Sequence, residues 1–245
     1  MRLRTLSAIW AAVGLSLVLA TTVAASDVVT VSPNDMNGWF FFNDNTNGPG
    51  TGHMVSGPGH PPLGSGSAQL TVATATDRQA LGTQAYQGTM LKNLTSLSYW
   101  THQTSPTHAI TLQFDVKYTA TNNAYQGRLV FEPGAGSGNP GIATAAWQRW
   151  DALNGKWWAS RSAASGGLCI QASPCTWAQV KTNWPDASLW PQGNLLFKVG
   201  GPWELWTGNV DAFTIGVRGH GTTTFDFEPA CGEEGDGQGD TNCGN

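Results

Sequence analysis

Four tryptophans lie within twelve consecutive residues of this chain, at positions 147, 150, 157 and 158. Arg149 and Asp151 stand among them, so the segment combines flat aromatic rings with one cation and one anion. An exposed indole can pack on the apolar C–H face of a pyranose, and charged neighbours can hydrogen-bond to its hydroxyl groups. These residue types therefore indicate sugar binding by stacking and hydrogen bonding, without bond cleavage.

The dipeptide Asn154-Gly155 predicts how these side chains are divided between two faces. Both residues tolerate the positive φ of a type I′ turn, so we expect a two-residue hairpin centred on them. Side chains alternate along paired strands. One face then carries Trp150, Ala152, Trp157 and Ala159, and the other carries Trp147, Arg149, Asp151, Trp158 and Ser160.

The first face carries no charge and is expected in the core. Burying Arg149 together with Asp151 would carry a heavy desolvation cost, so the second face is predicted to meet water or a ligand. The alternative is that this face lies at a strand edge and that the Gly- and Pro-rich loop 43–68 covers its indoles. The first group of candidate ligand-binding residues is Trp147, Arg149, Asp151 and Trp158.

A second aromatic group lies in the segment 201–211, which precedes a late strand and is predicted to be a loop. It contains Trp203, Glu204 and Trp206, followed by Asp211. Two indoles beside a carboxylate on a loop can form a ligand subsite. The same indoles can equally close the end of a sandwich, and the sequence leaves both possibilities open.

The carboxylates do not form a recognisable catalytic pattern. Glycosidases need two carboxylates at a fixed separation, and the Glu-x-Asp-x-x-Glu arrangement of many sandwich-fold glucanases is absent. The chain also lacks Gly-x-Ser-x-Gly and His-Glu-x-x-His motifs. We therefore predict no catalytic residues. A glycan-cleaving enzyme centred on Glu204 is the alternative.

The four cysteines are predicted to form disulfides. In an exported chain an even number of cysteines indicates a disulfide framework, and the pairs of least sequence separation are Cys169–Cys175 and Cys231–Cys243. Neither spacing is typical of zinc. We expect no metal or cofactor, although calcium could bind the acidic residues of the tail, Glu233, Glu234, Asp236 and Asp240.

The elements that must position these residues are mostly strands. Residues 109–118, AITLQFDVKY, alternate apolar and polar side chains and predict a strand with one buried and one wet face. Similar short runs recur along the chain, separated by Gly, Pro and Asn. One helix is expected at 173–185, capped by Ser173, begun by Pro174 and packed through Trp177, Val180 and Trp184. The pattern predicts an all-β fold, an antiparallel β-sandwich or jelly roll with one short helix.

The ends of the chain differ in composition from the middle. Residues 1–25, with Arg2, Arg4, an apolar run and Val23-Ala24-Ala25, are typical of a secretory signal peptide, while an uncleaved membrane anchor is the alternative. Residues 26–229 form the predicted sandwich domain, and 230–245 form an acidic, Gly-rich tail. No other stretch is long and apolar enough to span a membrane. We expect a secreted protein, outside the cell or at its surface.

The charge of the chain excludes some partners. Charged residues make up 11% of it, well below the roughly 25% of ordinary globular proteins. Loss of Arg2 and Arg4 with the leader changes the formal net charge from −4 to −6. Such a surface, poor in Lys and Arg, argues against nucleic acid or anionic membranes as partners.

Three stretches carry a resemblance to known proteins: 57–70 (GPGHPPLGSGSAQL), 147–162 (WQRWDALNGKWWASRS) and 208–229 (GNVDAFTIGV…TTTFDFEP). Together they resemble a group of exported bacterial β-sandwich proteins of undefined function. The strand VDAFTIGV is also similar to the final strands of jelly-roll carbohydrate-binding modules and lectin-like sandwiches. The resemblance implies a fold and supplies no catalytic residue. The sequence thus predicts a secreted, non-catalytic binding protein for a polysaccharide or other extracellular polymer, with a structural surface or matrix protein as the alternative.

Overall fold

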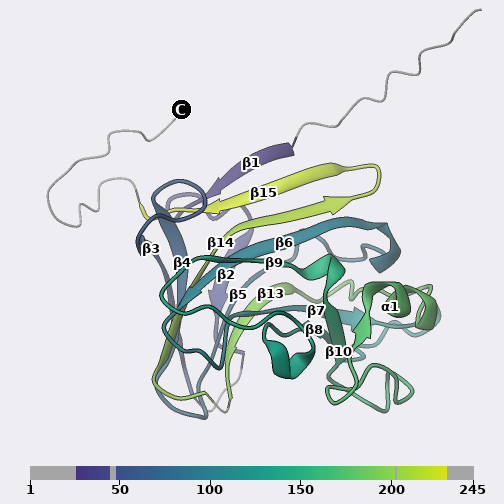
Figure 1. Cartoon of the computed structure of the whole chain (residues 1–245). Coiled ribbons are helices and arrows are strands. Elements are labelled where there is room, and N and C mark those ends of the chain that lie inside the picture. The colour runs from purple at the N-terminus through teal and green to yellow at the C-terminus, as the bar shows by residue number, and fades with distance from the viewer. Residues whose placement is uncertain (1–25, 45–47, 202, 231–245) are drawn as a thin grey trace, which may run out of the picture.

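Figure 1 shows the computed structural model of the chain, which describes residues 26–44, 48–201 and 203–230. Its strands form two sheets, and one α-helix, α1 (Trp177–Asn183), lies at one end of them near β10 (Lys156–Ala159). The predicted all-β sandwich with one short helix is confirmed. The predicted leader 1–25 and the pair Cys231–Cys243 lie outside the described residues.

The first sheet has the order β1-β15-β14-β4-β3, and β6 pairs with both β14 and β9. Its strands are β1 (Ser26–Val31), β3 (Thr51–Ser56), β4 (Gly66–Val72), β6 (Leu94–Gln103), β9 (Gln148–Asp151), β14 (Trp206–Val217) and β15 (Gly221–Phe227). The pair β1–β15 is parallel, whereas the other named pairs of the described residues are antiparallel. The sheet is therefore not purely antiparallel, because its first strand joins the edge beside its last.

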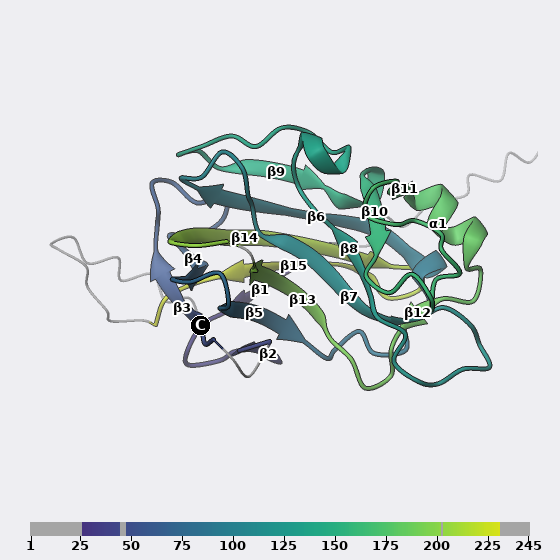
Figure 2. The same ribbon diagram turned by 90° about the horizontal axis from the view of Figure 1, so that it is seen from below.

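The second sheet has the order β11-β10-β8-β7-β13-β5-β2, with β12 pairing with β7. Its other strands are β2 (Trp39–Phe42), β5 (Arg78–Thr83), β7 (Thr111–Lys117), β8 (Arg128–Phe131), β11 (Cys175–Thr176), β12 (Ser188–Leu189) and β13 (Leu195–Gly200). Short 3-10 turns are η1 (Leu91–Asn93), η2 (Ala135–Ser137) and η3 (Ala152–Asn154). In Figure 2 the strands β5, β13, β7 and β8 run across the strands of the first sheet, so the two sheets form two layers.

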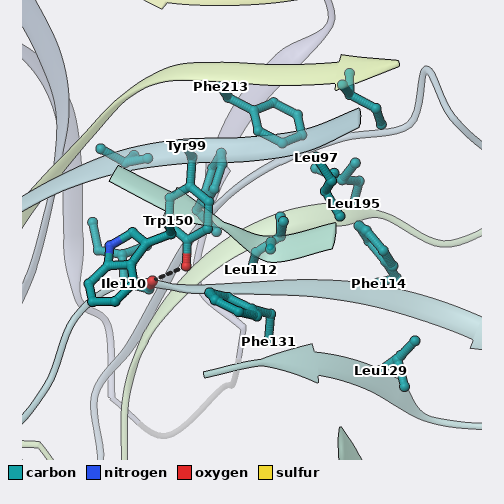
Figure 3. Close-up of a cluster of buried hydrophobic side chains, with 14 of the residues drawn as sticks. Leu97, Tyr99, Ile110, Leu112, Phe114, Leu129, Phe131, Trp150, Leu195 and Phe213 are labelled. Atoms are coloured by element: carbon teal, nitrogen blue, oxygen red, sulfur yellow. Dashed lines mark hydrogen bonds between the residues drawn. The ribbon is translucent and has the colours of Figure 1, made fainter. Parts of the chain in front are cut away.

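The core fills the space between these layers. Figure 3 shows Tyr99 and Phe213 of the first sheet and Phe131 and Phe114 of the second directed into it. The hydroxyl of Tyr99, which is fully buried, donates a hydrogen bond of 2.8 Å to the carbonyl of Ile110. The buried hydroxyl of Tyr99 is thereby satisfied, whereas that of Tyr118, also in the core, has no hydrogen-bond partner among the described residues.

The alternating pattern predicted that the outer face of β7 would be wet, but this face is buried. Gln113 and Asp115 point away from the core and are nevertheless buried. The Nε of Arg128 donates to Asp115 at 2.9 Å, and its two terminal nitrogens donate to Asp44. Lys198 also forms an ion pair with Asp44. The prediction of a wet face was wrong because Asp44, which follows β2, and the long side chains of Arg128 and Lys198 cover this surface.

The Gly- and Pro-rich stretch 43–68 contains regular structure, contrary to expectation. Residues 51–56 form β3, which pairs antiparallel with β4. Gly52 permits this pairing because a Cβ there would lie 2.4 Å from the ring of Phe41. The close approach of a neighbouring side chain, which composition does not reveal, explains the glycine in a strand.

The helix begins later than predicted. Ser173 and Pro174 precede it, and Thr176 is its N-cap in a capping box with Gln179. Cys175 is held in β11 and in a disulfide with Cys169, with the two Cα atoms 5.1 Å apart. The Cys169–Cys175 pair is confirmed. The expected buried stripe, Trp177, Val180 and Trp184, is also confirmed.

Candidate functional site

The predicted hairpin at Asn154-Gly155 does not form. The strands β9 and β10 on either side of it belong to different sheets, and η3 carries the chain from one sheet to the other. Gly155 is extended, with φ −88°. Asp151 accepts hydrogen bonds from the backbone N and side-chain Nδ2 of Asn154 at 3.3 and 2.8 Å. The turn signal was wrong because this capped helical turn, rather than a type I′ turn, suits a crossing between layers.

The predicted division of the four indoles nevertheless holds. Trp150 and Trp157 are 1% and 0% exposed, whereas Trp147 and Trp158 are partly exposed. Each strand alternates inward and outward side chains by itself, so the division does not need the hairpin. However, Trp147 lies at the outer face of the first sheet and Trp158 at that of the second, and they do not share one surface.

Trp147 and Arg149 share the outer face of the first sheet with two residues of β6. The register places Trp100 opposite Arg149, and the rings of His102 and Trp147 have centroids 5.6 Å apart. We call these four residues, Trp100, His102, Trp147 and Arg149, the β6–β9 face. Trp100 was missed from the sequence, although alternation against the buried Tyr99 could have indicated it.

The side chains of the β6–β9 face differ in exposure, hydrogen bonding and charge. The side chain of Arg149 is exposed and makes no hydrogen bond or ion pair with any described residue. Trp100 is partly exposed, and its Nε1 has no hydrogen-bond partner among the described residues. Burial lowers the pKa of His102, so its imidazole is neutral at pH 7. The face therefore offers one free guanidinium, two indoles and a neutral imidazole.

The segment 57–65 covers one border of this face. The Nε1 of Trp147 donates to the carbonyl of Pro58 at 2.9 Å, and Asp211 accepts from the backbone N of Leu63 at 3.1 Å. Residues of 43–68 therefore cover part of Trp147, as the alternative interpretation of the sequence predicted. Arg149 and Asp151 stay exposed beside it.

A separate cleft of about 670 Å³ is lined by residues 106–108, 132–137, 141–142 and 171–172. Glu132 lies in its wall, and one carboxylate oxygen, Oε2, accepts hydrogen bonds from Trp158 Nε1 at 2.9 Å and Gln171 Nε2 at 3.0 Å. The structure thus places Trp158 beside Glu132, where its N–H orients the carboxylate. Glu132 is not among the site residues predicted from the sequence.

The second predicted group lies beside the cleft through its contact with His108, one of the lining residues. The imidazole of His108 stacks on Trp203, with centroids 4.6 Å apart and planes at 14°, and Trp203 contacts Trp206. Both indoles are buried, so they close this end of the core. Glu204 is exposed and makes no hydrogen bond or ion pair with any described residue. His108 carried no signal in the sequence, since its stacking partner lies far along the chain.

Burial lowers the pKa of His108, and the charge of Glu132 raises it in part. Because the net shift is downward, the imidazole is neutral at pH 7. Glu132 lies within 4.0 Å of no cationic group of the described residues. The cleft wall therefore carries one fixed negative charge and a neutral aromatic ring.

Metal ligands do not gather in the described part of the chain: no group of three or more His, Cys, Asp or Glu lies together there. The acidic tail considered for calcium lies outside the described residues. Within those residues, no helix has the length and apolar character needed to cross a bilayer.

Fold and site together define an all-β sandwich protein with an exposed aromatic face on one sheet and a carboxylate-bearing cleft beside the other. The chain matches no protein-family model, and no curated protein has a significantly similar sequence.

Asp211 predicts how stability depends on pH. Burial raises the pKa of Asp211 to about 7, against hydrogen bonds from backbone N–H groups, including those of Phe227 and Leu63. The folded state therefore keeps a proton that the unfolded state loses, and stability falls as pH rises from about 4 to about 7. In the wild type, the free energy of unfolding in urea should fall between pH 5 and 7. In Asp211→Asn we expect this fall to be less steep, by about 1 kcal/mol per pH unit.

Asp226 provides the comparison for this titration. Burial raises the pKa of Asp226 to about 6, with the charge and hydrogen bond of Glu228 acting in the same direction. Its contribution has the same sign as that of Asp211 and remains in the variant, so a residual slope is expected. An unchanged slope in Asp211→Asn would contradict the assignment.

Proposed function

We propose that this protein binds a glycan, without chemistry, through the β6–β9 face. The observation that supports this most directly is the partly exposed Trp100 opposite the exposed guanidinium of Arg149, which is unpaired among the residues that the structure describes. Directly opposite residues on paired strands have Cβ atoms about 5 Å apart. An indole and a guanidinium at this spacing can contact the same sugar ring.

The remaining residues extend the same surface. Trp147 lies two residues before Arg149, so it projects from the same side of the strand, and it contacts His102. A pyranose can pack its apolar face on an indole, while the guanidinium and the neutral imidazole hydrogen-bond to its hydroxyls. We expect dissociation constants in the micromolar to millimolar range, about −8 to −4 kcal/mol.

We further propose that the protein is secreted, as the sequence predicted. The Cys169–Cys175 disulfide supports this, because structural disulfides persist in oxidising compartments outside the cytosol. A polysaccharide or other extracellular polymer is then the partner that the protein would meet.

Trp100→Ala tests the binding face. A glycan array should first identify a ligand for the wild type, whose affinity is then measured by titration calorimetry. We expect Trp100→Ala to weaken binding at least tenfold, about 1.4 kcal/mol, because the stacking surface is lost. Trp190→Ala is the matched control, since Trp190 is a partly exposed indole that contacts Tyr125, away from this face.

Two outcomes would contradict the proposal. One is equal weakening in Trp100→Ala and Trp190→Ala when both variants melt as the wild type does. The other is a wild type that binds no glycan but assembles as its concentration rises, which would favour the structural surface or matrix protein.

A further inference from the structure

The carboxylate of Glu132 is held in a fixed orientation in the cleft. Its Oε2 accepts from two neutral donors, Trp158 Nε1 and Gln171 Nε2, and its Oε1 has no hydrogen bond with any described residue. Two donors on one oxygen fix the carboxylate without neutralising it. The free oxygen is then available to a ligand that brings its own donor.

In the described part of the chain, no cation forms an ion pair with Glu132. His108, the other titratable residue of the lining, is neutral at pH 7 because burial lowers its pKa. The cation nearest in register is Lys156, but it is exposed and its Nζ lies beside Gly138, and it forms no ion pair with Glu132. An unpaired, oriented carboxylate in a concave wall is satisfied best by a cationic donor.

Other residues of the cleft lining suit a ring. Trp203 stacks on one face of the His108 imidazole and fixes its orientation, and His108 lines the cleft. Pro106, Pro133 and Ile142 add apolar surface to the same cleft. A pyranose packs well on such a wall, whereas the flexible chain of a lysine loses more conformational entropy on binding.

From these two features we infer that the cleft binds an amino sugar, with the protonated amine on Glu132 and the sugar ring against His108. This site is distinct from the β6–β9 face and shares no residue with it. The inference therefore survives or fails independently of the proposed function of that face.

A pair of matched oligosaccharides tests this inference. The probe is a tetramer of β-1,4-linked glucosamine, and its control is the same tetramer with every amine acetylated and therefore uncharged. By titration calorimetry at low ionic strength, we expect the full chain to bind the free-amine tetramer at least tenfold more tightly than the acetylated one. Glu132→Gln should abolish that preference, because it removes the charge and keeps the size of the side chain.

Two further variants make the test specific. Glu204→Gln removes the same charge from an exposed residue that does not line the cleft, and it should leave binding unchanged. Gln171→Ala keeps the charge of Glu132 and removes one of its orienting donors, so it should weaken binding severalfold. Because Gln171 is exposed, we expect Gln171→Ala to fold, so it tests the inference even if Glu132→Gln does not fold.

The overturning results are distinct. Equal binding of the two tetramers would show that the amine is not recognised. Equal loss in Glu204→Gln and Glu132→Gln would show a general effect of charge. Binding of a lysine-containing peptide, with the glucosamine tetramer left unbound, would assign the cleft to a protein partner.

Discussion

We expect the replacement of Asp44 with alanine to lower the free energy of unfolding in urea by about 3 kcal/mol. Asp44 binds both terminal nitrogens of Arg128 and the ammonium of Lys198, and the three side chains are 13–19% exposed. Its removal leaves Lys198 without its carboxylate, and Arg128 keeps Asp115 and a long hydrogen bond to Gln113. Leaving a cation poorly solvated and unpaired costs more than the pair itself contributes.

Asp186→Ala is the matched control for this substitution. Asp186 forms an ion pair with Lys92 at 3.9 Å, but both side chains are about half exposed, at 56% and 50%. Exposed pairs contribute little, so we expect a loss of less than about 0.5 kcal/mol. Similar losses in Asp44→Ala and Asp186→Ala would contradict a structural role for the covered network.

The effect of Asp44→Ala should also depend on pH. Burial raises the pKa of Asp44, but the hydrogen bonds and charges of Arg128 and Lys198 outweigh it and lower the pKa overall. The contribution of Asp44 is therefore present above the unfolded pKa and is lost as pH falls through the lower folded value. Below about pH 4 the difference between wild type and Asp44→Ala should shrink. This trend is opposite in sign to that of Asp211.

Trp157→Ala is expected to cost about 4 kcal/mol, the largest effect of a single substitution proposed for this protein. Trp157 is 0% exposed and contacts the rings of Phe114, Phe131 and Trp177 at centroid distances of 5.0, 5.6 and 5.2 Å. Its Nε1 also donates to the carbonyl of Ala152 at 2.8 Å. Truncation leaves a cavity between β10, α1 and the sheet, and it removes the donor of a buried carbonyl.

The next residue in sequence gives the comparison. Trp158 is partly exposed and lies on the outer face of β10, so Trp158→Ala should cost only about 1 kcal/mol in the same urea titration. If the two neighbouring substitutions have equal effects, the division of the indoles between core and surface is wrong.

The strands were predictable where their periodicity was local and complete. Alternation in AITLQFDVKY and similar short runs, with turn residues between them, was sufficient to predict an all-β sandwich, and the stripe Trp177, Val180 and Trp184 was sufficient for a helix. These patterns depend on which side of a single element is buried. They do not depend on which strand lies beside it, which a single sequence does not reveal.

Pairing between distant segments explains the errors. Asn154-Gly155 has the chemistry of a hairpin turn, but β9 pairs with β6 and β10 pairs with β8, so the two strands that it joins never meet. The glycines of 43–68 hid a strand because Gly52 is needed for close packing against Phe41. The outer face of β7 was judged wet because Asp44, far earlier in the chain, is the residue that covers it.

In the candidate sites, too, local patterns were predictable and contacts between distant segments were not. Trp147 and Arg149 were recognised by residue type, and Trp100 could have been added from strand alternation alone. The cleft could not be predicted, because Glu132, His108 and Gln171 come from three separated loops and strand ends. Trp158 was recognised as accessible but was assigned to the wrong surface, as its position followed from the hairpin.

The parallel pairing of β1 with β15 has a consequence for how the chain folds. Ser26–Val31 align with Thr222–Phe227, so β1 pairs with a segment 196 residues later in the sequence. Contacts between residues so distant in sequence slow folding. We therefore expect β1 to dock late, after the neighbouring strands β14 and β15 have paired.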